Sequence, residues 1–248
     1  MHRETLTHVL VAVKDFVITA SVEGIVKFWK KSNVGVLEFI KSFRAHSSPL
    51  TSAVLSPDGC WLATGSFDKS IKIFDVENFD MIKIIKYEEI VGQMLWWKSP
   101  TFNYFRLMVA NKVEPKEDEA ETDEGTGESE VSKSHLTIID PWDSSSKFKS
   151  VPNRLYTFFS EEIEVKLPEF TALAVHSASN ALIAGCSDFT LKFFSMEESQ
   201  DLKSVILNKI DVLTKKYADD FKLEEGNISG ITFSPDETQF ITMSSDQF

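Results

Sequence analysis

The stretch that decides the fold is SPDGCWLATGSFDKSIKIF, residues 56–74, because it contains two strand-like runs, each preceded by a tight turn. In Ser56–Gly59, the proline presets φ and the glycine tolerates positive φ, so these residues predict a hairpin turn. Residues 61–66 then alternate large apolar with small side chains, as a strand does. Asp68 occupies the next turn, where its carboxylate can accept hydrogen bonds, and Ser70–Phe74 form another alternating strand.

The same unit recurs along the chain. Ile25–Trp29 and Thr190–Phe194 share the alternating, aromatic-ended shape of Ser70–Phe74, and Trp29 lies 45 residues before Phe74. Leu136–Ile139 is a fourth candidate strand, because it falls about one period after Ser70–Phe74 when the insertion at 114–134 is subtracted. Residues 234–246 repeat residues 56–68 at an offset of 178, or about four periods of 44. A period of this size, with several short strands in each unit, indicates a β-propeller.

We therefore expect an all-β chain, with residues 1–248 forming about four and a half propeller blades. The last unit ends two residues after Asp246, without the strand that follows the turn acid in the other units. A half blade exposes unpaired strand edges, and such edges favour aggregation. The chain alone is expected to be poorly soluble or oligomeric.

Two segments depart from the repeat. Residues 114–134 contain nine acids, two lysines and no aromatic residue, which predicts a disordered, solvated loop within one blade. The alternative is a segment for phosphorylation, at Thr122 or Ser129, or for a basic partner. In residues 202–221, apolar side chains recur at helical spacing, so we expect a short outer strand and then a rim helix over 211–221. That helix either packs on the propeller or binds a partner.

Composition limits the classes of partner. The 248 residues carry a net charge of −12, which argues against nucleic acid or an anionic membrane as the main partner. Seven of those charges belong to residues 114–134, so the argument applies chiefly to that insertion. Cys60 and Cys186 are the two cysteines, too few for a disulfide framework, and an intracellular reducing compartment is expected. No apolar run reaches membrane length.

No pattern indicates catalysis. None of the five histidines lies at metal-ligand spacing from another, and no Gly-rich phosphate loop occurs, so we predict no catalytic, metal or cofactor residues. His8, His135 and His176 are expected to be strand or surface residues. Cys186 occupies the repeat position of Ser66, which predicts a structural role.

The pair Trp96–Trp97 allows two interpretations. Since successive strand residues face opposite ways, one ring can lie in the core and the other on the rim. Alternatively, the pair is an exposed aromatic contact for a peptide.

These motifs resemble the WD-repeat family. There, a histidine, a Ser or Thr, the turn aspartate and a tryptophan form a hydrogen-bonded chain that holds each blade together. In the second unit the matching residues are His46, Thr64 or Ser66, and Asp68, and Phe74 stands in place of the tryptophan. In the first unit His2 and Trp29 match, and Glu23 stands in place of the aspartate. Asp188 and Asp246 match the aspartate in later units. The resemblance implies a degenerate network, with packing carrying more of the stability.

Several stretches resemble one subfamily, the WD-repeat cyclophilins: residues 1–4, 16–21, 26–31, 43–46, 49–50 and 74–82. The match is dense over about residues 1–100 and thinner from 155 to 248. The resemblance implies a propeller followed by a C-terminal prolyl isomerase domain, and association with nuclear splicing complexes. Nothing in the sequence resembles the cyclophilin active site. We therefore expect a truncated gene product or a fragment that acts as a nuclear, non-catalytic scaffold and binds proteins such as splicing factors. The alternative is a foldase whose catalytic domain lies beyond residue 248.

Overall fold

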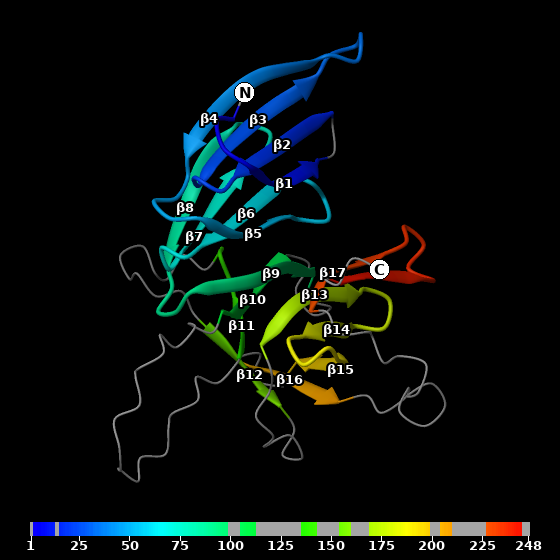
Figure 1. Ribbon diagram of the computed structural model, residues 1–248. Coiled ribbons are helices and arrows are strands. Elements are labelled where there is room, and N and C mark those ends of the chain that lie inside the picture. The colour runs from blue at the N-terminus through cyan, green and yellow to red at the C-terminus, as the bar shows by residue number, and fades with distance from the viewer. Residues whose placement is uncertain are drawn as a thin grey trace.

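The structure is a computed structural model, which describes residues 2–12, 15–98, 105–112, 135–142, 154–159, 169–198, 204–209 and 227–244. Every regular element in these ranges is a β-strand. The strands form four successive blades and a final hairpin, arranged as an arc (Figure 1).

The strand bounds follow the repeat. Blade 1 contains β1 (Leu6–Val11), β2 (Phe16–Ser21), β3 (Ile25–Lys31) and β4 (Leu37–Arg44). Blade 2 contains β5 (Leu50–Leu55), β6 (Trp61–Ser66), β7 (Ser70–Asp75) and β8 (Asp80–Lys86). Blade 3 contains β9 (Val91–Lys98), β10 (Phe105–Asn111), β11 (Leu136–Ile139) and β12 (Arg154–Phe159). Blade 4 contains β13 (Phe170–His176), β14 (Ala181–Cys186), β15 (Leu191–Glu198) and β16 (Ser204–Lys209), and the hairpin contains β17 (Ile228–Phe233) and β18 (Phe240–Ser244).

Within each blade, neighbouring strands pair antiparallel in chain order. Blades 3 and 4 are also joined at their outer strands, because β12 pairs with β16 in parallel. These two blades therefore form one eight-stranded sheet, whereas blades 1 and 2 are separate four-stranded sheets. The repeat in the sequence contains no signal for this junction.

The hydrophobic core lies between blades. Alternate residues of each strand point to opposite faces, so each inner blade packs against both neighbours. One cluster joins blades 1 and 2 around Phe28 and Phe74, a second joins blades 2 and 3, and a third joins blades 3 and 4. We call the face toward the preceding blade the leading face and the other the trailing face.

Two glycines allow the inner strand of the next blade to approach closely. A Cβ at Gly65 would overlap the Val91 side chain on β9, and a Cβ at Gly185 would overlap Ile228 on β17. The two glycines hold equivalent positions, next to the last residue of β6 and of β14. Small residues at this position set the spacing between blades.

The two repeated turns have the local bonds that the sequence predicts. Ser56 Oγ lies 2.5 Å from an oxygen of Asp58, and Ser234 Oγ lies 2.6 Å from one of Asp236. Gly59 has a φ of 71°, and Glu237 takes the same left-handed conformation with a φ of 54°. Because a side chain is strained there, Glu237 needs compensation, and its carboxylate accepts a 2.9 Å hydrogen bond from the Ser177 N–H of blade 4.

Three predictions lie outside the described residues: the disordered insertion at 114–134, the helix at 211–221 and the turn acid Asp246. In the part of the chain that is described, no helix is long and apolar enough to cross a membrane.

Candidate functional site

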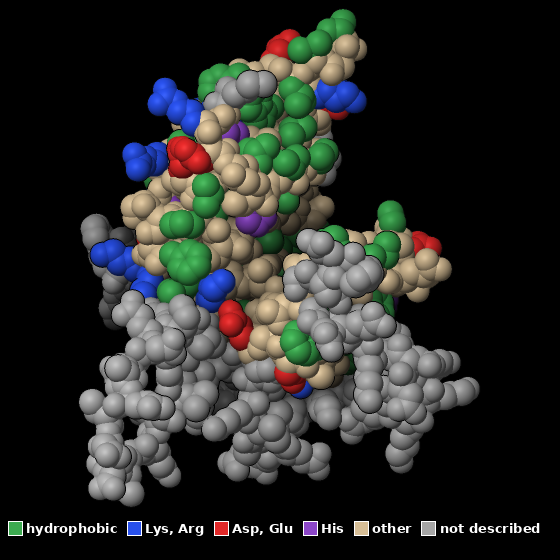
Figure 2. All heavy atoms as spheres, viewed as in Figure 1, with side chains coloured by type: hydrophobic (Ala, Val, Ile, Leu, Met, Phe, Trp, Pro, Cys, Tyr) green, Lys and Arg blue, Asp and Glu red, His purple; other side chains and the backbone are tan. Residues whose placement is uncertain are grey.

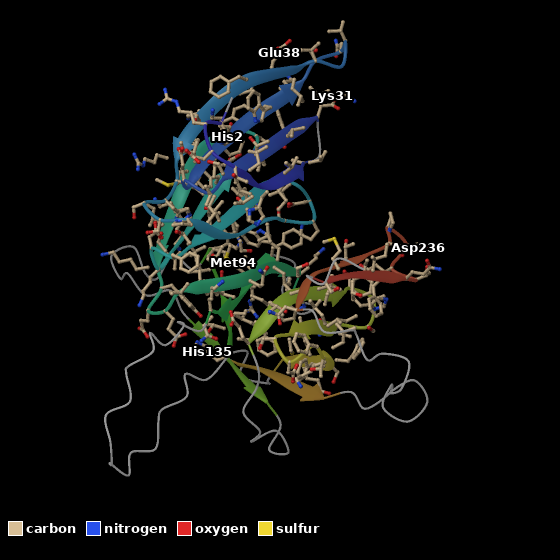
Figure 3. The ribbon with its side chains drawn as sticks, viewed as in Figure 1. His2, Lys31, Glu38, Met94, His135 and Asp236 are labelled. Atoms are coloured by element: carbon tan, nitrogen blue, oxygen red, sulfur yellow. The ribbon has the colours of Figure 1, made fainter. Side chains whose placement is uncertain are left out.

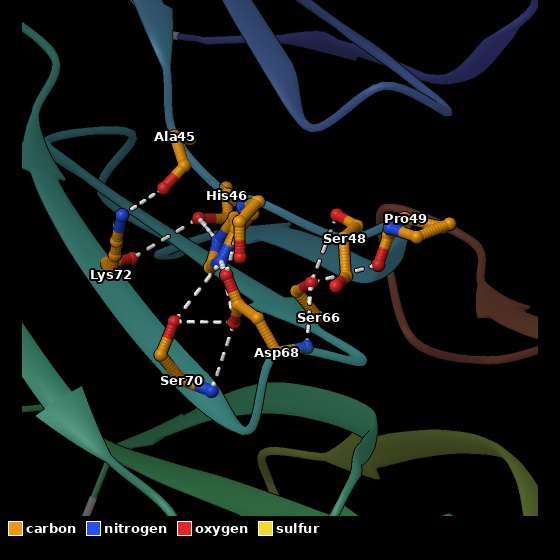
Figure 4. A network of polar contacts seen from close by, with 10 residues as sticks. Ala45, His46, Ser48, Pro49, Ser66, Asp68, Ser70 and Lys72 are labelled. Atoms are coloured by element: carbon orange, nitrogen blue, oxygen red, sulfur yellow. Dashed lines mark hydrogen bonds and ion pairs between the residues drawn. The ribbon is translucent and has the colours of Figure 1, made fainter.

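His46 is the centre of a polar network in blade 2 (Figure 4). It lies between β4 and β5 and is 1% exposed. Its Nδ1 lies 3.1 Å from both carboxylate oxygens of Asp68, and its Nε2 lies 2.8 Å from Thr64 Oγ1. Asp68 also accepts hydrogen bonds from Ser70 Oγ at 2.6 Å and from the Ser47 N–H at 3.1 Å. With Asp68 as acceptor, Nδ1 carries the ring proton and Nε2 accepts from Thr64.

Thr64 and Ser66 have different roles. Ser66 Oγ donates to the Pro49 carbonyl at 2.8 Å and accepts the Asp68 N–H at 3.1 Å. The sequence left Thr64 and Ser66 open as the partner of His46, and the structure places Thr64 there. Ser70, which the sequence reasoning missed, stands two residues after Asp68, a common position for a turn hydroxyl.

Burial lowers the pKa of His46 despite the nearby Asp68 carboxylate. For Asp68, burial raises the pKa, but hydrogen bonds from Ser70, His46 and Ser47 outweigh it and hold the pKa below its ordinary value. The pair is therefore a neutral histidine beside a carboxylate at neutral pH. The pair joins the segment between β4 and β5 to β6 and to the β6–β7 turn.

Blade 1 has a different version of this network. Thr19 Oγ1 lies 2.8 Å from His2 Nε2 and accepts a 2.8 Å hydrogen bond from Trp29 Nε1. No hydrogen bond joins Glu23 to His2, and the buried His2 Nδ1 has no partner among the described residues. The sequence reasoning missed Thr19, which lies 45 residues before Thr64 and could have been found from that offset.

Asp188 in blade 4 bonds within its own turn, accepting from Thr190 Oγ1 at 2.6 Å. Lys192 Nζ lies 3.6 Å from its carboxylate. Cys186, at the position equivalent to Ser66, is fully buried, and this burial raises its pKa to about 12. The thiol is un-ionised at neutral pH and packs in the core cluster between blades 3 and 4.

The other histidines make local contacts. His8 Nδ1 lies 3.0 Å from Thr7 Oγ1, His135 Nε2 lies 3.3 Å from Glu89, and His176 Nδ1 lies 2.6 Å from Ser179 Oγ. The described residues contain no cluster of His, Cys, Asp or Glu able to hold a metal ion.

Trp96 and Trp97 both lie in the core. Trp96 is 6% exposed and packs between blades 2 and 3, whereas Trp97 is 2% exposed and packs between blades 3 and 4. Their Nε1 groups donate to the Val54 carbonyl at 3.2 Å and to Asn180 Oδ1 at 2.8 Å. Neither is an exposed anchor or a rim residue, because β9 has a blade on each face.

Trp142 completes the aromatic packing beside Trp96. Its ring centroid lies 4.6 Å from that of Trp61 and 6.4 Å from that of Trp96. Its Nε1 donates to the Phe105 carbonyl at 3.0 Å. The sequence reasoning missed this tryptophan because it stands outside the repeated strands.

The inner strands line the hollow inside of the arc (Figure 1). One hollow of about 1430 Å³ is lined by β1, β5, β9, β13, β17 and the Ser56 and Ser234 turns. Its surface is mostly apolar, with Asp58, Lys98 and Glu237 as its charged residues.

A smaller cavity of about 370 Å³ lies where four of these strands begin, and we call it the polar mouth. Thr51, Gln93, Lys112 and Glu169 line it, and Lys112 Nζ lies 5.2 Å from the centre of the half-exposed Phe67 ring. The buried hydroxyls of Thr51 and Thr171 have no partner among the described residues. The arrangement can offer hydrogen bonds and both signs of charge to a peptide.

Comparison with known proteins agrees with this geometry. The family model "WD domain, G-beta repeat" matches residues 37–75. Over its whole length the fold is similar to the β-propeller domain of Myceliophteria thermophila Cps50 (Swd1), with a TM-score of 0.62 and 14% identity. That comparison covers 99% of this chain and 64% of the other. The chain therefore contains a WD40 repeat and folds as a WD-type β-propeller.

Similar curated proteins share the WD region. The chain is 45% identical over 100 residues to human and mouse "Peptidylprolyl isomerase domain and WD repeat-containing protein 1". It is 44% identical over 96 residues to "Peptidyl-prolyl cis-trans isomerase CYP71" of Arabidopsis thaliana. These matches cover 40% and 39% of this chain but 15% of each relative.

Proposed function

We propose that this chain is a non-catalytic protein-interaction module, the propeller part of a splicing-associated WD-repeat prolyl isomerase, and that it acts in the nucleus. The observation that carries the proposal is the 45% identity over 100 residues to proteins named for a WD repeat and an isomerase domain. WD propellers generally bind other proteins, and the His46 network in blade 2 holds the blade together.

The polar mouth is the surface we assign to partner binding. Phe67 is 38% exposed there, and Lys112 and Glu169 line it with charges of opposite sign. Splicing factors are the proposed partners because of the subfamily resemblance.

Affinity capture tests this proposal. The purified chain is incubated with nuclear extract, and the captured proteins are quantified by mass spectrometry against a bead control. We expect spliceosomal proteins to be enriched, and Phe67→Ala with Lys112→Glu to reduce that enrichment severalfold. Val34→Asp, at an 84% exposed position in the β3–β4 turn, is the matched control. If the Phe67→Ala/Lys112→Glu protein captures as much spliceosomal protein as the Val34→Asp protein, the polar mouth is not the binding surface.

The names of the relatives favour a second candidate, a foldase whose catalytic domain lies outside these 248 residues. A prolyl isomerase assay on the chain itself is expected to show no cyclosporin-sensitive activity. Sequencing the transcript beyond codon 248 would show whether an isomerase domain follows.

A further inference from the structure

The outer strand of blade 2, β8, has a row of exposed side chains on one face. Within β8, Met81 is 39% exposed and Ile84 is 53% exposed, and the exposed Lys86 ends the strand. These three lie opposite alternate residues of β7: Met81 opposite Phe74, Ile84 opposite Lys72 and Lys86 opposite Ser70. Because directly paired residues of an antiparallel ladder share a face, the three side chains form one row. We call Met81, Ile84 and Lys86 the rim row.

The rim row lies on the leading face of blade 2, toward blade 1. Phe74 belongs to the core cluster between these two blades, and Lys72 Nζ donates to the Ala45 carbonyl just after β4. Both blades are complete four-stranded sheets, so the exposure of the row does not result from a missing neighbour. Figure 2 shows hydrophobic side chains and Lys or Arg side chains next to one another along the outer edge of these blades.

The edge of β8 is poorly suited to pairing with a further strand. The register of β7 with β8 shifts between Ile73 and Phe74, which leaves Ile82 as an extra residue in a bulge. Lys83, the next residue, donates from Nζ to the Pro141 carbonyl of blade 3 at 2.7 Å. Bulges and lysines on an edge strand oppose strand addition. A partner therefore contacts the side chains of the row and does not extend the sheet.

The chemistry of the rim row is apolar, apolar and basic. Lys86 lies two residues beyond Ile84, at a distance along the strand of roughly 7 Å. Across β4 and β8, four basic side chains outnumber two acidic ones, although the whole chain has a net charge of −12. The complementary partner surface is apolar, apolar and acidic.

The acids around this surface are mostly engaged elsewhere. They are Glu38, Asp68, Asp80, Glu88 and Glu89. Asp80 lies 2.6 Å from Lys41, Glu89 lies 3.3 Å from His135, and Asp68 belongs to the His46 network. Glu38 lies near Lys31 and the β3–β4 turn (Figure 3), and not at the end of β4 that reaches Ala45. Glu88 adds one negative charge near the row, against Lys72 and Lys86.

We infer that the rim row binds an extended segment of a partner protein with the pattern apolar, any, apolar, any, acidic, in either chain direction. An extended peptide repeats its face every two residues, as the row does, so its side chains can meet Met81, Ile84 and Lys86 in turn. Single-stranded RNA fits less well, because the row has no aromatic ring on which a base could stack. This surface is on the outer strands and the polar mouth is on the inner ones, so the inference stands independently of the proposed function.

Fluorescence anisotropy with labelled synthetic peptides tests the inference. The probes are peptides of about 12 residues that contain Leu-x-Leu-x-Glu or its reverse within a Gly-Ser sequence. We expect one of the two directions to bind at least about fivefold more tightly than a peptide of the same composition whose glutamate is moved by one position. Absence of saturable binding in both directions, or equal binding of the shifted peptide, would overturn the inference. Competition by a single-stranded RNA that is lost in Lys86→Glu would assign the row to nucleic acid and also overturn it.

Variants of the row locate the binding. We expect Ile84→Asp and Lys86→Glu each to weaken peptide binding about tenfold, and Lys86→Glu to bind a peptide with lysine in place of the glutamate more tightly than the original peptide. Val34→Asp, an apolar-to-acidic change at an exposed position outside the row, is the matched control and should bind like the unmodified chain. Since the replaced side chains are exposed, all three variants should keep the thermal transition of the unmodified chain. Unchanged binding by Ile84→Asp, or no reversal of preference in Lys86→Glu, would place the peptide elsewhere and overturn the inference.

Discussion

A single buried histidine, His46, links the stability of blade 2 to pH. Its pKa is lowered by burial, so the unfolded chain takes up this proton first as the pH falls through the ordinary value near 6.5. Its contribution to stability is complete above that value and declines below it. Asp68 has a lowered pKa, so its contribution is present above its ordinary value near 3.8 and is lost as the pH falls through its lower folded pKa.

We therefore expect the free energy of unfolding to be level near neutral pH, to decline below about pH 6.5 and to decline again in strong acid. Urea denaturation between pH 5 and pH 8 would measure the first decline. His46→Gln should make this decline shallower, and part of it should remain because burial also lowers the pKa of His2 and of His8. His135→Gln, at a 41% exposed side chain, is the control. Equal slopes in all three proteins would remove His46 as the cause.

The two cysteines should differ in reactivity. Cys186 is fully buried with a pKa raised to about 12, whereas Cys60 lies in the half-exposed turn after Asp58. Because the thiolate is the reactive form, a thiol reagent should label Cys60 in the folded protein and both cysteines in denaturant. Mass spectrometry of the labelled peptides gives the result, and fast native labelling of Cys186 would show that blade 4 opens readily.

Sequence reasoning was strongest for residues that bond within one repeat. The WD-repeat resemblance implied a contact between His46 and Asp68, and the structure has it, although His46 lies between β4 and β5 and Asp68 lies in the turn between β6 and β7. The choice between Thr64 and Ser66 could not be made, since both hydroxyls lie in β6 and only the face they point to separates them. Thr19 was not predicted for a related reason: hydroxyl residues are common in strands, whereas Trp29 and His2 have distinctive side chains.

The close contact between β6 and β9 depends on Gly65. A methyl group there would overlap Val91, so Gly65→Ala should force the two blades apart and destabilise the protein by about 1–3 kcal/mol. Val91→Ala removes the overlapping atoms. We therefore expect the double variant to be less destabilised than the sum of the two single variants, as measured by a denaturant double-mutant cycle. If the two changes in the free energy of unfolding simply add, overlap with Val91 is not the reason that Gly65 is needed.

At the level of elements, the repeat period located the strands well, but it did not reveal their relations across blades. Trp96 and Trp97 show the difficulty: alternation predicts opposite faces, but not that both faces of β9 are covered. The parallel pairing of β12 with β16 was equally hidden, because strand pairing between repeats depends on loop lengths and not on residue pattern. Trp142 lies outside the period, so the pattern was silent about its packing against Trp61.

The acidic insertion should be separable from the folded body. Replacing residues 114–134 with a short Gly-Ser linker removes seven of the twelve net negative charges. Because the cost of closing a loop changes slowly with its length, the free energy of unfolding should change by less than about 1 kcal/mol. Thermal and urea denaturation would check this, and a large loss of stability would show that the insertion packs on the blades.

The whole-molecule fold followed from one number, the period near 44, because a repeated unit that buries its faces only against its neighbours must stack. The period did not predict which apolar residues of the end units are exposed. Val11, on the leading face of blade 1, and Met243, on the trailing face of the hairpin, are exposed because no described unit packs against them.

The arrangement of units also sets where the molecule opens first. Among the described residues, blades 2, 3 and 4 each pack against a unit on both faces, whereas blade 1 and the hairpin each pack against one. Stability in such an array is close to a sum over units and their nearest-neighbour interfaces, so fluctuations should begin at the two ends and move inward. Amide hydrogen exchange should therefore be slowest in β6 and β10 and fastest in β1 and β18. The free energy of local opening would then be highest in the central blades and lower toward each end of the arc, and the arc would not unfold in one cooperative step.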